Sequence, residues 1–550
     1  MILKLEPKTW LLIILALAFL TRVVGLNYSL PLLVVGDEPA SVFGTLKMME
    51  LKTLLPVLHL DEFKPLLYYP PYLSYLYLPF FAVLLGLKFL FLNVSLEEFK
   101  NLIVADPASL FLAARFLSVI FGVGTVYLVY KIGKNIFKAE TPALLAAGFL
   151  ALSILHVNFS HWARHWGFAT FFFTLVFYIL SRDDFLPPKK YLWAALAAGL
   201  GVGVNYQVGL SAFFILFWFL FYDRLSLRVH FKKGRVYAAG GLFLALAALA
   251  FLLYPPGLVV KSDSTLLAGH SLGGLAGSYG FYLGKLFEAE PLLLFFFMIG
   301  LIYLFLQESR FFWIALAFIF LYVAVFYFFF FIVERYILML YPIFALAAGY
   351  GLYALYSSTD LKLRPAVLGL GVLSFLFLLL VAIRFDLVLL KNDTRFQALE
   401  WVKTNLPPGS KIAVLASLTH LPTFPEAFSE QEKIDPASLR KRDLAELGLP
   451  DKFLFLPRYH ALNLYAVTSE SFFRTITNYL RENGYEYALY SPEFAKLRRA
   501  DPALETSGEV IKTFAGFEAS DDDFTNGFGG GLGNLFLREA NGPTIVIKKI

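Results

Sequence analysis

Long apolar stretches separated by short polar connections dominate the first 390 residues of the chain. A helix that crosses a membrane needs about 20 mostly apolar residues. We expect about 11 such spans, with 13 as the upper bound. A twelfth apolar stretch, Tyr69 to Leu92, carries Pro70-Pro71 at its start and is considered separately below. The eleven clearest spans are expected at residues 9–28, 108–130, 141–160, 166–181, 191–205, 207–222, 236–256, 291–306, 311–332, 335–356 and 365–389.

The pattern changes near Lys391, where short segments with helix or strand periodicity replace the apolar stretches. These segments indicate a compact soluble α/β domain over residues 391–550, after a membrane domain over residues 1–390. The expected fold class is a polytopic α-helical membrane protein with a C-terminal soluble α/β domain. Within the tail we expect helices at 394–405 and 472–483, and strands at 411–415, 487–490 and 544–548.

Composition supports this division of the chain. It is 58% hydrophobic and 16% charged, with 60 Phe, whereas a soluble protein is about a quarter charged. Nearly half of the charged residues follow residue 390. A soluble enzyme, a nucleic-acid-binding protein and a disordered chain are therefore excluded. The sequence contains no Cys, which also excludes disulfides and thiolate metal sites.

Basic residues orient the spans, because Lys and Arg accumulate in cytoplasmic loops. With a cytoplasmic N-terminus, the basic connections all lie inside only if the stretch at 69–92 does not cross the membrane. We therefore expect 69–92 to form an interfacial or re-entrant helix. The tail is then extracytoplasmic, in a multi-pass protein of the plasma membrane. The basic connections lie near residues 131–138, 182–190, 224–235, 310 and 362–364.

The first outer loop, residues 27–67, carries Asp37 and Glu38 just past the first span. Residues 41–53 follow with the spacing of an amphipathic helix, which would lie on the membrane and hold the carboxylates at a fixed depth. A carboxylate near an apolar surface is a natural general base. Solvated surface charge is the alternative interpretation. We take Asp37 and Glu38 as candidate catalytic residues.

Three further outer segments carry polar side chains. The turn at 161–166 supplies either the polar tips of an interfacial aromatic belt or contacts to phosphate or metal. The charged corner at 334–335 either snorkels to the interface or binds phosphate. The break between the spans expected at 191–205 and 207–222, at residues 205–206, also lies on the outer face. The residues expected to share an outer cavity with Asp37 are His161, Arg164, His165, Asn205, Tyr206, Glu334 and Arg335.

A long outer loop is expected at residues 257–290. It contains Gly269-His270-Ser271-Leu272-Gly273, a formal match to the nucleophile elbow of hydrolases, but that motif acts only between a strand and a helix. We interpret the segment as a mobile loop or lid. In the tail, residues 527–533 are expected to form a flexible glycine turn beside a solvated acidic tip at 521–523, for which a calcium site is the alternative.

Five short motifs follow one another along the chain. Together they resemble the motifs of the GT-C glycosyltransferases, in the superfamily of protein O-mannosyltransferases and lipid A aminoarabinose transferases. The resemblance implies a GT-C fold, a polyprenyl-phosphate-linked sugar donor, and a lipid, protein or glycan acceptor. The motifs are Asp37-Glu38, Tyr69-Pro70-Pro71-Tyr72, Ala113-Ala114-Arg115-Phe116, Glu334-Arg335-Tyr336-Ile337-Leu338 with Pro342, and the segment from Arg395 to Lys411.

The resemblance also implies roles for individual residues. Asp37 would be the catalytic base or would orient the acceptor, and Glu38 would assist it. Arg335 would hold the donor phosphate, and Arg164 would stabilise the charge that develops there.

The chain departs from the family pattern at two positions. Many members place an Asp where this sequence has His165-Trp166, and a Lys where it has Asn205. These residues identify no particular cofactor, and a divalent metal held by His165 and Asp37 is left open. Lys64 is a candidate to supply the missing positive charge near the donor phosphate.

The hypothesis from the sequence is an inverting glycosyltransferase that moves a sugar from a polyprenyl-phosphate-linked donor to an acceptor hydroxyl on the outer face of the membrane. The alternatives are a transporter or flippase for lipid-linked sugar, and a non-catalytic membrane protein that binds it. Transporters usually contain internal repeats of their spans, and we find none in this sequence.

Overall fold

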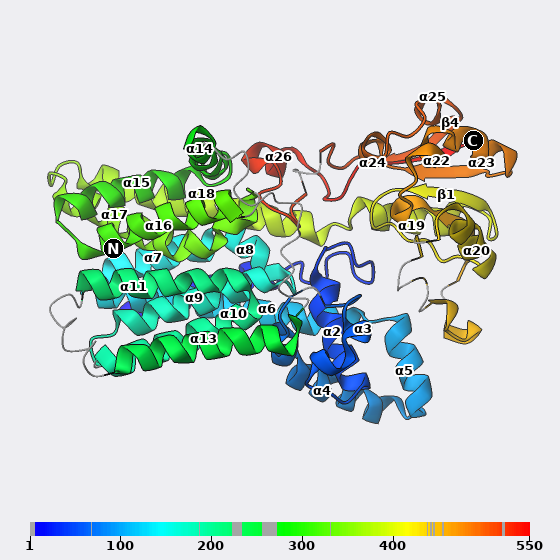
Figure 1. Ribbon diagram of the computed structural model, residues 1–550. Coiled ribbons are helices and arrows are strands. Elements are labelled where there is room, and N and C mark those ends of the chain that lie inside the picture. Colours follow the sequence, from blue (N-terminus) through cyan, green and yellow to red (C-terminus); the bar gives the residue numbers. More distant parts are fainter. Residues whose placement is uncertain are drawn as a thin grey trace.

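The structure is a computed structural model. A bundle of helices that run side by side forms one part of the molecule, and the tail lies beyond one end of this bundle (Figure 1). The two chain termini lie at opposite ends of the molecule (Figure 1). The structure describes all residues except 1–5, 68, 186, 223–233, 256–271, 330–331, 437, 440–442, 444–445, 454–455 and 520–522.

Each of the eleven apolar stretches contains a helix. In the part of the chain that the structure describes, six helices are long and apolar enough to cross a membrane, or seven if the bent pair α7 and α8 forms one span. The number of crossings stays a prediction. The helices are α1 (Pro7–Val23), α6 (Ala108–Phe137), α7 (Glu140–Leu152), α8 (Ile154–His161), α9 (His165–Ser181), α10 (Pro187–Val204), η2 (Tyr206–Leu210), α11 (Ser211–Tyr222), α13 (Arg235–Leu253), α15 (Pro291–Leu306), α16 (Arg310–Phe329), η5 (Glu334–Leu340), α17 (Tyr341–Ser358) and α18 (Arg364–Leu390).

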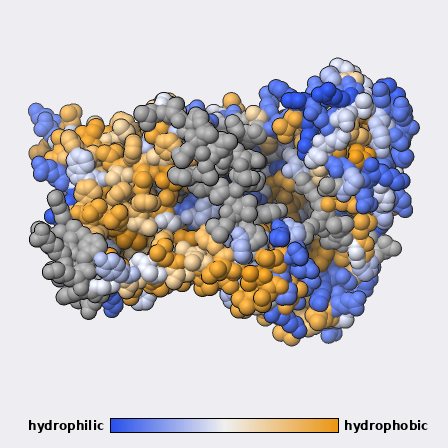
Figure 2. Space-filling view, in the orientation of Figure 1, coloured by the Kyte–Doolittle hydropathy of each residue, from blue (hydrophilic) through white to orange (hydrophobic). Residues whose placement is uncertain are grey.

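The first loop and the segment that follows it form a group of helices beside the end of the bundle, on the same side as the tail (Figure 1). Helix α4 exposes Leu90 and Phe91, at 76% and 85%, and its surface belongs to an apolar region (Figure 2). Its position relative to the membrane stays a prediction. The helices of this group are α2 (Glu38–Glu50), η1 (Pro56–His59), α3 (Leu60–Phe63), α4 (Tyr72–Leu92) and α5 (Leu96–Ala105).

Helix α14 (Leu272–Ala289) replaces most of the long loop expected at 257–290. Leu275, Tyr282 and Leu286 are buried. They lie on one helical face, and the glycines between them had obscured this spacing. The Gly269–Gly273 motif begins outside the described residues, as does the first half of the expected lid.

The tail contains a five-stranded sheet in the order β2-β1-β3-β5-β4. Strand β1 pairs in parallel with β2 and β3, whereas β5 is antiparallel to β3 and β4. The strands are β1 (Lys411–Leu415), β2 (His460–Asn463), β3 (Tyr487–Tyr490), β4 (Glu509–Phe514) and β5 (Ile545–Lys549). The helical segments are α19 (Thr394–Asn405), α20 (Pro425–Ile434), η6 (Asp451–Phe453), η7 (Leu464–Ala466), α22 (Glu470–Arg474), α23 (Ile476–Glu482), α24 (Pro492–Leu497), α25 (Ala503–Thr506) and α26 (Gly531–Leu537).

The structure confirms some of the elements expected in the tail and corrects others. Helix α19 and strands β1 and β3 have the expected bounds, and β5 is shifted by one residue. The single helix expected at 472–483 is wrong, because the chain breaks at Thr475 between α22 and α23. Strands β2 and β4 were missed. The side chains of β4 are mostly exposed, so it has no alternation of buried and exposed positions to reveal it.

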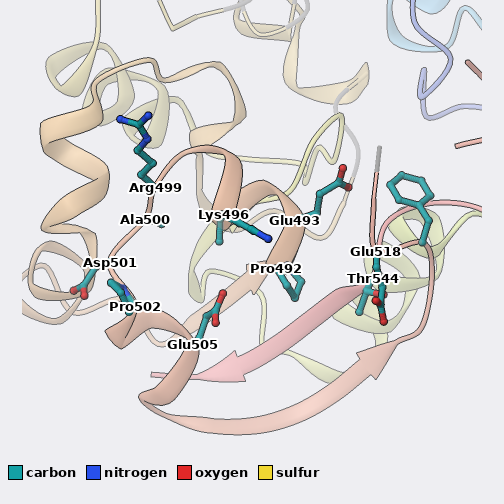
Figure 3. Close-up of a pocket in the computed structure, with 12 residues that line it drawn as sticks. Pro492, Glu493, Lys496, Arg499, Ala500, Asp501, Pro502, Glu505, Glu518 and Thr544 are labelled. Carbon is teal, nitrogen blue, oxygen red and sulfur yellow. The ribbon is translucent and has the colours of Figure 1, made fainter. Parts of the chain in front are cut away.

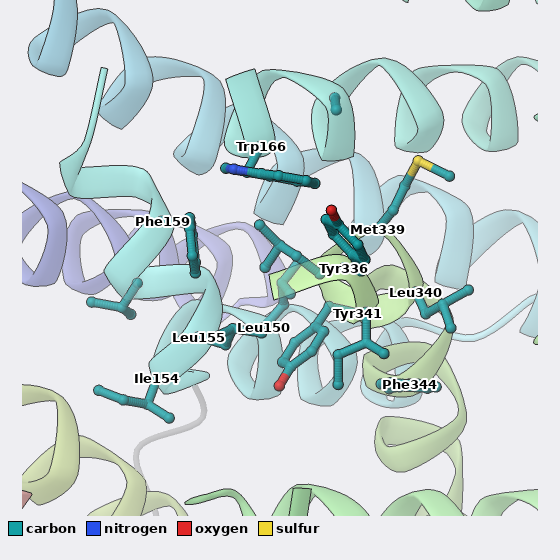
Figure 4. Packing of buried hydrophobic residues seen from close by; sticks show 14 of the residues in the cluster. Leu150, Ile154, Leu155, Phe159, Trp166, Tyr336, Met339, Leu340, Tyr341 and Phe344 are labelled. Atoms are coloured by element: carbon teal, nitrogen blue, oxygen red, sulfur yellow. The ribbon is translucent and has the colours of Figure 1, made fainter. Parts of the chain in front are cut away.

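A sharp bend of 56° separates α7 from α8, and charged side chains satisfy the backbone groups that it frees. Arg22 donates to the carbonyls of Leu150 and Ala151 at 3.2 and 2.8 Å. On the other side, Glu290 accepts the backbone N–H of Leu155 at 3.0 Å. A helix end buried in a membrane bundle needs such partners. The surrounding core is apolar (Figure 4).

Helices α15 and α17 pack closely through glycine. A Cβ atom on Gly300 would clash with the backbone carbonyl of Ala347, and one on Gly351 would clash with that of Phe296. Small residues allow helices in membranes to approach in this way.

We expect Gly300→Ala to lower the free energy of unfolding by about 1–3 kcal/mol, because the added methyl group meets backbone rather than a flexible side chain. Thermal unfolding in detergent measures the change. Gly369→Ala in α18 is the matched control, since nothing lies within 4 Å of the added atom there. Equal unfolding midpoints for the two variants would contradict the close packing of α15 on α17.

Candidate active site

A fully buried ion pair between Glu38 and Arg115 anchors the first loop to the bundle. Arg115 Nε and Nη2 donate to the two carboxylate oxygens at 2.9 and 2.7 Å, and neither side chain is exposed. Arg115 Nη1 also donates to the carbonyls of Leu26 and Tyr28 at 3.0 and 2.9 Å. The backbone N–H of Ala163 donates to Glu38 Oε1 at 2.7 Å. The pair therefore has the additional hydrogen bonds that a buried ion pair requires.

This ion pair positions the residues next to it in the sequence. Asp37 precedes Glu38 and occupies the N-cap of α2 with a left-handed backbone, φ 66°. Arg164 follows Ala163, and its Nη2 donates to Asp37 Oδ2 at 2.8 Å. The side chain of Arg164 is 2% exposed, whereas that of Asp37 is 33% exposed. The carboxylate is thus held from one side and remains accessible from another.

The charges around Asp37 keep it ionised at neutral pH. Burial raises the pKa of Asp37, but the positive charges of Arg164 and Arg335 outweigh burial and hold this pKa below its usual value. The hydroxyl of Tyr69 also donates to Asp37 Oδ2, at 3.4 Å. Burial and the charge of Asp37 raise the pKa of Tyr69, so its hydroxyl stays protonated. Asp37 is therefore an acceptor of hydrogen bonds or of a proton.

Arg335 lies on an aromatic surface near Asp37. Its guanidinium carbon is 5.7 Å from the ring centres of both Trp166 and Tyr336, and the two rings lie close to each other (Figure 4). Arg335 Nε is buried and has no hydrogen-bond partner among the described residues. A stacked guanidinium with unused donors suits a phosphate group.

Two further predicted residues belong to this cluster. The ring of His165 packs on the rings of Tyr69 and Trp166, with centres 4.2 and 4.4 Å apart. Tyr206 is close enough to interact electrostatically with Arg335 and Asp37. Across the described parts of the chain, no group of three or more His, Cys, Asp or Glu is placed to hold a metal ion.

His161 and Asn205 make contacts with residues other than Asp37. His161 is buried in the bundle, with Nε2 2.9 Å from the carbonyl of Val24 and 3.7 Å from Asp386. Asn205 caps η2, and its side chain accepts the backbone N–H of Gln207 at 2.9 Å. His161 is thus bonded within the bundle, whereas the buried Nδ2 of Asn205 has no hydrogen-bond partner among the described residues.

Lys64 and Glu334 also have partners of their own. Lys64 is exposed and lies 3.6 Å from Asp61. Glu334 Oε2 accepts the backbone N–H of Phe528 in the tail at 2.6 Å, and its Oε1 lies 3.2 Å from Lys285 of α14. Glu334 therefore connects the corner before Arg335 to the tail and to α14.

Sequence reasoning assigned no role to two parts of the site. Arg115 was noted only as part of a motif, although a charge inside an apolar span is itself a sign of function. The tail segment Asp523–Phe528 contacts the bundle beside Asp37 and is mostly buried. The expected solvated acidic tip is wrong at Asp523, which is 8% exposed; residues 521 and 522 lie outside the described residues. The turn expected at 527–533 is too long, because helix α26 begins at Gly531.

A separate cavity of about 700 Å³ lies in the tail (Figure 3). It shares no lining residue with the cluster around Asp37. Its charged lining residues are Glu493, Lys496, Arg499, Asp501, Glu505 and Glu518.

The fold and the site define a helical membrane protein that gathers a carboxylate and two arginines at one end of its bundle. Over residues 108–254 the chain matches the family described as dolichyl-phosphate-mannose-protein mannosyltransferase. This match supports the resemblance to the mannosyltransferase superfamily that the motifs predicted, and one of those motifs, Ala113-Ala114-Arg115-Phe116, lies within the matched segment.

The chain is also similar to several solved structures. ArnT from Cupriavidus metallidurans in the apo state has a TM-score of 0.43 and 11% identity, over 92% of this chain and 96% of that chain. The same protein bound to undecaprenyl phosphate has a TM-score of 0.44 and 11% identity, over 98% of both chains. Arabinofuranosyltransferase AftD from Mycobacteria has a TM-score of 0.42 and 13% identity, over 93% of this chain and 38% of that chain. A comparison with curated proteins finds no match.

We expect Glu38→Gln to lower the free energy of unfolding by about 3–5 kcal/mol, because it leaves the buried charge of Arg115 uncompensated. Unfolding in detergent measures this loss. Glu470→Gln is the matched control, since Glu470 and its partner Arg474 are both largely exposed, and we expect a change below about 1 kcal/mol. Similar losses in the two variants would show that the Glu38–Arg115 pair does not anchor the loop.

Proposed function

We propose that this protein is an inverting glycosyltransferase that moves a sugar from a polyprenyl-phosphate-linked donor to an acceptor hydroxyl on the outer face of the membrane. The observation that carries the proposal is the cluster of Asp37, Arg164 and Arg335, which combines an ionised carboxylate with two guanidinium groups. The description of the family matched by residues 108–254 names mannose linked to dolichyl phosphate, and dolichyl phosphate is a polyprenyl phosphate.

The transfer is a single displacement at the anomeric carbon of the sugar. Asp37 takes the proton of the acceptor hydroxyl as its oxygen forms the new bond to that carbon. The bond between the carbon and the phosphate oxygen breaks, and polyprenyl phosphate leaves with the electron pair. Because attack comes from the side opposite the phosphate, the configuration of the sugar inverts.

The two arginines stabilise the leaving phosphate. Arg335 offers unused donors on a rigid aromatic surface, and negative charge develops on the phosphate as the bond breaks. Binding of the donor also affects the base. Arg164 and Arg335 hold the pKa of Asp37 low, so a phosphate that engages Arg335 raises that pKa and strengthens the base when the donor is present.

Glu38 acts as a positioning residue in this proposal. Its carboxylate is fully buried against Arg115, and so it holds Asp37 in place. His165 packs beside the base as part of the wall of the site.

We expect the tail to be extracytoplasmic and the N-terminus cytoplasmic. A reporter that is active only outside the plasma membrane, fused after Ile550, should give a signal, because the basic connections lie inside when the tail lies outside. The same reporter inserted at Lys362 is the control and should be silent. Activity at Lys362 and silence at Ile550 would reverse the orientation and remove the proposed site from the outer face.

We expect Asp37→Asn and Arg335→Ala to impair sugar transfer in different ways. Asp37→Asn removes the base, so kcat should fall by about 10²–10⁴-fold while the donor still binds. Arg335→Ala removes a phosphate contact, so the affinity for the donor should fall as well. Transfer of radiolabelled sugar from polyprenyl phosphate and binding of the donor in detergent measure the two effects.

The control for these variants is Arg474→Ala, at an exposed arginine of the tail, which should retain both transfer and donor binding. Undiminished transfer by Asp37→Asn would refute its role as the base. Donor binding without transfer by the unaltered protein would favour the transporter or the non-catalytic binding protein.

A further inference from the structure

A short segment of the tail, Asp523–Phe528, is held against the bundle by main-chain hydrogen bonds. Asn158 of α8 donates through Nδ2 to the carbonyls of Phe524 and Gly527, at 2.5 and 2.8 Å. Its Oδ1 accepts the indole N–H of Trp162 at 2.8 Å. Asn158 is 1% exposed. All three hydrogen bonds are therefore made away from solvent, where losing one is costly.

Arg164 connects this segment directly to Asp37. Its Nη1 donates to the carbonyl of Thr525 at 2.7 Å, and its Nη2 donates to Asp37 Oδ2 at 2.8 Å. Because the guanidinium is planar and rigid, fixing one nitrogen restricts where the other can lie. The carbonyl of Thr525 thus helps to determine the position of the charge beside Asp37.

The other end of the segment contacts the corner that carries Arg335. The backbone N–H of Phe528 donates to Glu334 Oε2 at 2.6 Å. Gly527 lies close against the same carboxylate, so a Cβ atom there would displace the Glu334 side chain from its present position. This close approach accounts for one glycine of the run that the sequence suggested was a flexible turn.

The segment is also fixed from the side of the tail. Asp523 accepts the backbone N–H of Thr525 at 2.9 Å and the side chain of Asn541 at 3.4 Å. Asn541 in turn donates to the hydroxyl of Tyr28 at 3.1 Å, and the carbonyl of Tyr28 accepts from Arg115. The tail is therefore connected to the same buried ion pair that places Asp37.

We propose that the segment Asp523–Phe528 aligns the catalytic site from the tail, with Asn158 and Glu334 as positioning residues for Arg164 and Arg335, an inference that rests on the proposed function. The segment contributes its main chain to this alignment. The hydrogen bonds of Asn158 go to Phe524, Gly527 and Trp162 rather than to Asp37, and it acts through Thr525 and Arg164. Sugar transfer thus requires the tail to be docked on the bundle.

The proposal predicts a specific change in the pH dependence of transfer. Arg164 lowers the pKa of Asp37 against the effect of burial. If Arg164 loses its anchor, the pKa of Asp37 rises, the base is protonated at higher pH, and the acidic limb of the rate profile moves to higher pH. The charged or titratable groups that face Asp37 are Arg164, His165, Arg335, Tyr69, Tyr206 and Tyr336.

The test is Asn158→Asp in the full chain, which keeps the acceptor for Trp162 but replaces the donating amide by an oxygen that faces two carbonyls. We expect kcat to fall about 10²-fold, as for other misplaced catalytic groups. We expect the acidic limb to move up by about one pH unit. The backbone amides of Thr525 and Phe528 should exchange hydrogen faster. Asn158→Ala, which introduces no charge, should show the same changes to a smaller degree.

Asn483→Asp, at an exposed asparagine of the tail, is the matched control and should behave as the unaltered protein. If Asn158→Asp and Asn158→Ala transfer sugar at the normal rate and with the normal pH profile, while Asp37→Asn is inactive, the inference is wrong and the proposed function stands. A slower rate with an unmoved acidic limb would also overturn the inference. If Asp37→Asn is fully active, the proposed function falls, and the inference falls with it.

Discussion

The buried pair of Glu38 and Arg115 is the interaction on which the rest of the site depends. Removing two charges from water costs several kcal/mol per ion unless both are paired and hydrogen-bonded. Here Arg115 also donates to the carbonyls of Leu26 and Tyr28, and Glu38 also accepts the backbone N–H of Ala163. One ion pair therefore joins the first loop, α6 and the turn after α8. The residues adjacent to its ends, Asp37 and Arg164, meet as a consequence.

A second constraint is the break between α7 and α8, which brings that turn to the end of the bundle. A bent helix in an apolar environment leaves backbone groups without partners. Arg22 satisfies carbonyls at the end of α7, and Glu290 satisfies an amide at the start of α8. Arg22 also lies 2.8 Å from His156 of α8. These buried charges thus have a structural purpose, and they fix the direction in which α8 points Asn158 toward the tail.

The parts predicted correctly from the sequence are those encoded by local patterns. Apolar stretches of sufficient length marked the helices, and short, mostly apolar runs, which are buried in the structure, marked β1 and β3. Asp37 could be selected because it follows a span directly. In the sequence Glu38 is as good a candidate as Asp37, yet it lies one residue further along the chain, at the start of α2, and its side chain is directed toward Arg115. Such pairings join residues far apart in the chain, and nothing near Glu38 in the sequence indicates them. The tail segment was missed for the same reason, since the glycines of a flexible turn and those of a tightly packed segment look alike.

The two arginines of the site differ in how they are held. Arg164 is bonded at one nitrogen to the tail and at another to Asp37, so its charge is fixed. Arg335 rests on Trp166 and Tyr336 with its Nε unused. A fixed cation is suited to tuning the carboxylate, and a stacked one with unused donors is suited to binding an anion that enters and leaves. Both arginines lower the pKa of Asp37. An anion that binds to Arg335 reduces the effect of Arg335 on this pKa, whereas the effect of Arg164 persists as long as the tail stays docked. In the proposed mechanism, occupancy of the donor site and docking of the tail therefore act on Asp37 through different arginines.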